Sequence, residues 1–372
     1  MVNKKERMAN IELLRILAMT MVVMLHYLGK GNLLPNLTEE IKGNGYLAWS
    51  MEILCIVAVN VYMLISGYFL VESGFKWRRL VKLLCQVMFY TLLIPGALIL
   101  FGVISIRDLT LNQLLQYIFP VQKEHYWFVT AYVLMYLFSP VLSAAVKSMK
   151  KRQLQMVIIS LLLFLSVSKS ILPLRLDMDK LGYDGIWFLC VFLIAAYMRL
   201  YGISFYKNGK RGFFLYLLFS GGTLLILFVS HFICVRTGQL ALFMETIYGY
   251  NHIFNIFAAI SLFYAFYYYK LPKGKISKWI CKIAPYTFGV YLLHEHEQLR
   301  YRWPIWVMAN SEGNPLVFLI RSIFSVLLVF AVGVIVDMIR DFLFRLIGKL
   351  LKGSFIDRKL SDLDSYFAEE KS

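Results

Sequence analysis

Long apolar runs recur along the whole chain, and they limit its possible folds more than any other feature of the sequence. Of the 372 residues, 59% are hydrophobic and only 16% are charged, whereas about a quarter of the residues in a soluble domain are charged. An α-helix needs about 20 apolar residues to cross a bilayer. We therefore expect an all-α fold, a polytopic bundle of about ten transmembrane helices. The runs cover residues 10–29, 46–70, 80–104, 126–146, 154–172, 184–202, 212–233, 250–270, 281–295 and 315–338.

Basic residues are distributed unequally between alternate connections of these runs. The connections on the side of the N-terminus, together with the C-terminal segment, hold 25 Lys and Arg residues, and those on the other side hold 10. Because basic loops stay in the cytoplasm, we expect both termini there, in a multi-pass protein of the plasma membrane. Residues 1–350 then form one integral membrane domain and residues 351–372 a short cytoplasmic tail. This topology explains the net charge of +17, so no nucleic acid is expected as a partner.

The spacing of cysteine and histidine argues against a metal centre. The five cysteines lie within or at the ends of apolar runs and form no CxxC pair, so neither a disulfide framework nor a zinc site is indicated. The segment His294-Glu-His-Glu297 contains several ligand types but lacks the HExxH spacing. We expect no metal and no bound cofactor.

Two ionisable residues lie within the first apolar run, where such groups are costly and point to function. Arg15 and His26 are eleven residues apart, so on a helix they project from one face, about 16 Å apart along the axis. The alternative is that Arg15 extends to the interface as an anchor and that His26 is a satisfied core histidine. Their shared face favours a functional pair.

The first run also resembles that of the acyltransferase-3 family, whose membrane proteins O-acylate surface polysaccharides and related glycans. The signature of that family is a basic residue, ten further residues and a histidine, which here are Arg15 and His26. The resemblance covers about residues 10–340, and its further motifs follow in the family's order: Leu64-Ile-Ser66-Gly67-Tyr68-Phe69, Lys76-Trp-Arg78-Arg79-Leu-Val-Lys82, Trp127 with Tyr132 and Pro140, and Tyr291-Leu-Leu-His294. Many members carry a glutamate in place of Tyr132, and Glu124 and His125 could replace it here.

The resemblance implies acyl-CoA as the donor, with its pyrophosphate or pantetheine amides meeting the deeper Arg15 and its phosphates held at the inner boundary by Arg78, Arg79 and Lys82. Basic side chains bind phosphate, although anchoring in the cytoplasm would also explain the last three. His26 would act as a general base or as a transient acyl carrier, and both roles stay open. The other expected catalytic residues are His294, Glu124 and His125, and the expected substrate or motif residues are Ser66, Gly67, Trp127, Tyr132, Asn251 and His252.

The resemblance thus predicts an integral membrane O-acyltransferase. We expect it to transfer an acyl group, foremost acetyl from acetyl-CoA, to a hydroxyl of an extracytoplasmic or lipid-linked glycan, as in polysaccharide biosynthesis. Its partners would be acyl-CoA, the glycan and membrane lipids, and the sequence leaves both a monomer and a homo-oligomer open. The alternative is a transporter or flippase, in which intramembrane Arg and His would line a substrate or proton path.

Overall fold

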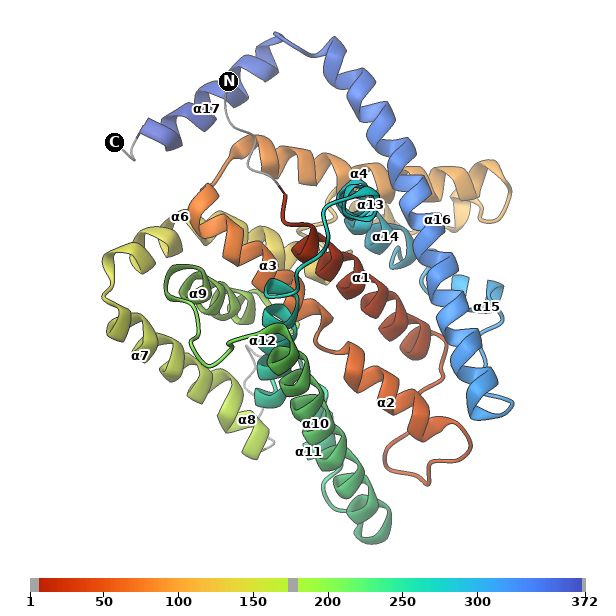
Figure 1. Cartoon of the computed structure of the whole chain (residues 1–372). Coiled ribbons are helices and arrows are strands. Elements are labelled where there is room, and N and C mark those ends of the chain that lie inside the picture. Colours follow the sequence, from red (N-terminus) through yellow and green to blue (C-terminus); the bar gives the residue numbers. More distant parts are fainter. Residues whose placement is uncertain (1–6, 173–179, 370–372) are drawn as a thin grey trace.

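The computed structural model describes residues 7–172 and 180–369, and all regular elements in these ranges are helical (Figure 1). Seven helical stretches are long and apolar enough to cross a membrane. Five are α1 (Ala9–Lys30), α4 (Trp77–Leu100), α6 (Trp127–Ser148), α10 (Gly209–Thr237) and α16 (Pro315–Leu350). The other two each contain two helices: one contains α2 (Gly45–Cys55) and α3 (Ala58–Ser73), and the other, Lys151–Ile171, contains α7 (Lys151–Leu162) and α8 (Ser168–Ile171). The predicted all-α polytopic class is confirmed.

The count of ten spans is not confirmed, because the other expected spans are shorter helices. Two of them, α9 (Gly185–Tyr201) and α12 (Ile253–Tyr267), are apolar helices of fewer than 18 residues. The expected span 281–295 is divided between α13 (Lys275–Ile283), a short turn with Pro285, and α14 (Thr287–His294). The remaining helices are α5 (Leu111–Ile118), α11 (Ala241–Ile247), α15 (Trp303–Trp306) and α17 (Phe355–Glu369), the last within the expected tail.

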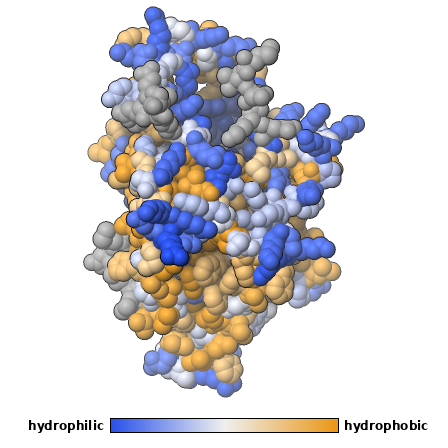
Figure 2. Space-filling view, turned by 60° about the vertical axis from the view of Figure 1, so that its left-hand side comes forward, coloured by the Kyte–Doolittle hydropathy of each residue, from blue (hydrophilic) through white to orange (hydrophobic). Residues whose placement is uncertain are grey.

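Segments that the sequence places toward the same side of the membrane contact one another. At the end where α1 begins, Asn10 donates to the carbonyl oxygen of Phe266 at 2.9 Å. At the opposite end, Asn44 donates to the carbonyl oxygen of Ser311 at 2.8 Å. We call the end where α1 begins the basic end and the other end the opposite end. Figure 2 shows a broad hydrophobic surface below a more hydrophilic upper part.

The first helix lies at the centre of the bundle, where α3, α12, α14 and α16 all pack against it (Figure 1). Its side chains are mostly buried, including Leu14, Val23 and Tyr27. A side chain of α1 is therefore held by neighbours on several sides, which fixes its rotamer better than a position facing lipid does.

A buried ion pair fixes the position of α14 against α4 and α16. Asp337 on α16 is fully buried and accepts hydrogen bonds from Gln86 at 3.0 Å and from Tyr90 at 2.9 Å. Arg340 completes the shell with a 2.6 Å contact from Nη2 to Oδ2 of Asp337. A Cβ atom on Gly289 of α14 would lie only 2.2 Å from the Asp337 carboxyl carbon. The Asp337 carboxylate is therefore an internal anchor between helices.

Candidate active site

The two histidines of the resemblance lie in direct contact, although 268 positions separate them in the sequence. Nδ1 of His26 lies 2.8 Å from Nε2 of His294. On its other side, Nδ1 of His294 lies 2.6 Å from the carbonyl oxygen of Val290, which only accepts hydrogen bonds. In the neutral rings, Nδ1 of His294 therefore carries its proton, Nε2 of His294 accepts, and Nδ1 of His26 donates. The lone pair of His26 is then on Nε2, the atom that can bind a proton or an acyl group.

A buried carboxylate adjoins this pair. Oε2 of Glu295 lies 3.3 Å from Nδ1 of His26, and the Glu295 side chain is 7% exposed. Its other oxygen lies 3.9 Å from the Lys30 ammonium and 3.8 Å from the Arg300 guanidinium. Because a buried carboxylate needs cationic partners, these contacts stabilise its charge. Of these groups, the Glu295 carboxylate favours a positive charge on the His26 ring, whereas Lys30 and Arg300 disfavour it.

At the basic end, a cavity of about 200 Å³ adjoins Arg15. Its lining includes the expected site residues Arg15, Ser66, Arg79 and Tyr132, and we call it the basic cavity. The Nε atom of Arg15 is buried and forms no hydrogen bond with any of the described residues, and the Glu12 carboxylate lies 3.7 Å away. The cavity thus presents two guanidinium groups to an anion.

Arg79 also lines a second, more open cavity of about 540 Å³, which we call the vestibule. Its lining consists of Lys76, Arg78, Arg79, Lys82, Ser361 and Asp364, so α17 forms one wall and the start of α4 the other. Arg78 is turned toward α17, with Nη2 2.9 Å from the Asp357 carboxylate and 2.6 Å from the Ser361 hydroxyl. The predicted basic group is therefore divided: Arg79 faces both cavities, and Arg78 holds the C-terminal helix.

His26 lines a narrow apolar cavity of about 30 Å³, which we call the slot. The helices α1, α3 and α6 contribute to both the slot and the basic cavity. On each helix one residue lines the slot and another lines the basic cavity: Met19 and Arg15 on α1, Tyr62 and Ser66 on α3, and Phe128 and Tyr132 on α6. Each pair is four residues apart, about 6 Å along a helix, so the slot lies one turn further from the basic end. The Tyr62 hydroxyl donates to the Arg15 carbonyl oxygen at 2.9 Å, so a residue that lines the slot contacts the backbone of one that lines the basic cavity.

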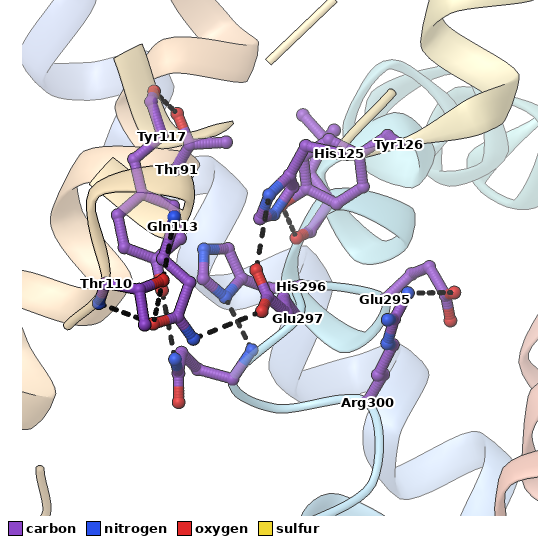
Figure 3. A network of polar contacts seen from close by, with 12 residues as sticks. Thr91, Thr110, Gln113, Tyr117, His125, Tyr126, Glu295, His296, Glu297 and Arg300 are labelled. Atoms are coloured by element: carbon purple, nitrogen blue, oxygen red, sulfur yellow. Dashed lines mark hydrogen bonds and ion pairs between the residues drawn. The ribbon is translucent and has the colours of Figure 1, made fainter. Parts of the chain in front are cut away.

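His125 belongs to a separate polar cluster next to this centre (Figure 3). Its ring lies 4.7 Å from that of His296, centroid to centroid, and its Nδ1 lies 4.0 Å from the Glu297 carboxylate. Figure 3 shows Glu295 turned toward Arg300 on one side, with His296 and Glu297 turned toward His125 on the other. Burial, assisted by Arg300, lowers the pKa of His125 to about 4. Burial also lowers the pKa of His296 well below its ordinary value. Both rings are therefore neutral at pH 7.

Other residues named in the sequence analysis lie elsewhere. Glu124 forms an exposed ion pair with Lys180 at 3.3 Å. Asn251 donates to the carbonyl oxygen of Leu165 at 3.0 Å, which secures a turn between helices. His252 is 3% exposed and packs on Phe254. Gly67 has no side chain and therefore allows α9 to approach α3 closely. Trp127, in contrast, lines the slot with His26.

Two residues of the site were not identified as site residues from the sequence. Glu295 was considered only as part of a possible metal cluster, and Tyr62 carried no motif. The signal for Glu295 was available, because a carboxylate directly after a functional histidine at the end of an apolar run is costly unless it has a partner. For Tyr62, nothing in the sequence indicated contact with α1.

Comparison with known proteins identifies the family. A family model described as an acyltransferase domain, that of the acyltransferase-3 family, matches residues 8–338, nearly the whole helical bundle. No curated protein and no solved structure gave a match. The matched range contains the histidine pair, the basic cavity and the slot, and it ends before α17. The chain therefore belongs to the acyltransferase-3 family and is a membrane-embedded acyltransferase.

Proposed function

We propose that the protein transfers an acyl group, expected to be acetyl, from cytoplasmic acyl-CoA to a hydroxyl of a glycan on the opposite side of the membrane. The observation that carries this proposal is the arrangement of the three cavities. Arg79 lines both the vestibule and the basic cavity, and Arg15 of the basic cavity lies one turn of α1 from Met19, which lines the slot with His26. Cationic walls at one end suit the phosphates of coenzyme A, and an imidazole at the other suits acyl transfer.

His26 is the group that we assign to the proton transfer. Its Nε2 takes the proton of the acceptor hydroxyl while the hydroxyl oxygen attacks the thioester carbonyl carbon. The C–S bond then breaks, and the proton passes from Nε2 to the leaving thiolate. The role of a transient acyl carrier at the same Nε2 is the alternative. The Glu295 carboxylate, 3.3 Å from Nδ1, stabilises the positive charge that the His26 ring acquires in either role.

Comparison of surface glycans tests the proposal. Cells with the gene, without it, and complemented with the His26→Gln variant are compared by NMR and mass spectrometry of their isolated glycans. We expect an alkali-labile ester in the first and its absence in the other two, with an otherwise unchanged glycan. Loss of the whole glycan would contradict the proposal and favour a flippase. An unchanged ester content in all three would also overturn it.

A further inference from the structure

The slot beside His26 is small and apolar, so it suits a small apolar group. Its walls are apolar and aromatic, and they include Val22, Val59, Phe128 and Tyr291. A single water needs about 10–15 Å³ of such space, so the slot of about 30 Å³ has room for about two small groups. A sugar ring exceeds this volume and carries several hydroxyls that the apolar lining would leave unpaired.

One polar group in the slot lacks an acceptor. The Tyr291 hydroxyl is buried and donates no hydrogen bond to any group in the part of the chain that the structure describes. A buried hydroxyl proton without an acceptor costs about 1–3 kcal/mol, so an occupant that accepts one hydrogen bond would be favoured. The Tyr291 ring lies 6.3 Å from that of His26, centroid to centroid. A carbonyl group with a short apolar chain meets both requirements.

The walls of the slot are braced and cannot yield easily. Asn60, next to Val59, donates to the carbonyl oxygen of Tyr250 at 2.7 Å and accepts from the Trp187 indole at 2.9 Å. Tyr250 in turn stacks on Trp127, with centroids 5.8 Å apart. Valine side chains are stiff at χ1, and close-packed interiors resist the insertion of extra methylene groups.

We propose that the slot is the acyl-binding site and that Val22 and Val59 limit the acyl chain to two or three carbons. The carbonyl oxygen of the donor accepts from Tyr291, the short chain lies against the two valines, and the carbonyl carbon lies beside His26. This inference rests on the proposed function and deepens it, because it identifies the class of donor by its chain length. The rest of the donor extends through the basic cavity toward Arg79.

Equilibrium binding to the full-length protein in lipid nanodiscs tests this inference without an acceptor. The probes are free coenzyme A and its acetyl, propionyl, butyryl and hexanoyl thioesters. A pocket discriminates by roughly 10–200-fold per methylene that does not fit. For the natural sequence we expect acetyl-CoA and propionyl-CoA to bind at least about tenfold more tightly than butyryl-CoA and hexanoyl-CoA.

Matched valine variants locate the effect. Val59→Ala and Val22→Ala enlarge the slot, and each should improve the affinity for butyryl-CoA relative to acetyl-CoA by about tenfold or more. Val61→Ala is the control, because Val61 is equally buried on α3 but does not line the slot. Two enlarging variants keep the test decisive if one of them fails to accumulate.

The outcomes separate the two claims. If coenzyme A and all its thioesters fail to bind, the proposed donor is wrong and the inference falls with it. If coenzyme A binds but chain length has no effect, the inference alone is overturned. The same holds if both enlarging variants keep the chain-length profile of Val61→Ala. A shift confined to Val22→Ala and Val59→Ala supports the acyl-binding slot.

Discussion

The Glu295 carboxylate lies 3.3 Å from Nδ1 of His26, and it comes directly after His294, which contacts the same nitrogen at 2.8 Å. One short segment at the end of α14 therefore supplies both neighbours of the histidine on α1. A fixed acceptor at Nδ1 keeps the ring oriented and leaves Nε2 available for the substrate. The segment after α14 is thus as important to the site as the helix that carries His26.

Glu295 is expected to act as a positioning residue. The Glu295→Gln variant keeps the size of the side chain but removes the charge that stabilises an imidazolium at His26. We predict a loss of about 10² in kcat, equivalent to about 2.7 kcal/mol, with an unchanged KM for the donor. Glu297→Gln is the matched control, since Glu297 faces His125 instead. Equal effects of the two variants on kcat would contradict this role.

His26 itself is expected to be indispensable for acyl transfer. A general base contributes about 10²–10⁴ in rate, so His26→Gln should leave no more than a few per cent of the activity at matched protein amounts. His231→Gln serves as the control, because His231 is a buried histidine that contacts the Leu37 carbonyl oxygen, 2.8 Å away. Activity is measured as ester formation on the isolated glycan. If most of the activity persisted in His26→Gln, the residue would be structural.

Arg79 and Arg78 are expected to differ in their importance for the donor. Arg79 lines both the vestibule and the basic cavity, whereas Arg78 is engaged by Asp357 and Ser361 of α17. A hydrogen bond to a charged group contributes about 1.5–3 kcal/mol. Arg79→Ala should therefore weaken coenzyme A binding about ten- to a hundredfold, and Arg78→Ala should weaken it less. Binding to the full-length protein in nanodiscs measures both constants, and the reverse order would show that Arg78 holds the phosphates.

The orientation of the chain can be tested by cysteine labelling. The asymmetry of basic residues predicts that Glu40 and Ser311 lie outside and that Ser148 and Lys207 lie in the cytoplasm. All four positions are exposed. In a background with the exposed Cys85 replaced by serine, single cysteines at the first two positions should react with an impermeant reagent on intact cells. Those at the other two should react only after the membrane is opened, and the opposite pattern would reverse the direction of transfer.

Local periodicity carried much of what the sequence could predict. The helical class follows from the length of the apolar runs, and the shared face of Arg15 and His26 follows from the spacing of residues within one helix. Tertiary contacts were beyond this reasoning. The approach of His294 to His26 depends on how α14 packs against α16, where Gly289 of α14 leaves room for the buried Asp337 of α16. The contact of α17 with Arg78 likewise joins segments more than 270 residues apart.

The lengths of individual spans were also hard to predict. The run 46–70 is continuous in hydropathy, yet the chain departs from a regular helix between Cys55 and Ala58 and forms α2 and α3. The run 281–295 shortens because Pro285 interrupts it and because the chain turns at Glu295 to reach His26. Hydropathy reports the environment of a segment, whereas these breaks are set by contacts with other helices.

The buried histidine cluster should make the stability of the protein depend on pH. Burial lowers the pKa of His125 to about 4, whereas the unfolded chain has an ordinary pKa near 6.5. Above about pH 6.5 both states are neutral at this residue and the fold has its full stability. As the pH falls from there toward about 4, only the unfolded state takes up the proton. The equilibrium constant for unfolding therefore rises by up to tenfold per pH unit, and the fold loses stability. His296 has an effect of the same sign, since its pKa is also lowered.

The temperature of half-unfolding in detergent, measured from pH 8 to pH 5, tests this pH dependence. It should fall less steeply for His125→Gln than for the natural sequence. Parallel curves for the two proteins would contradict the assignment to His125.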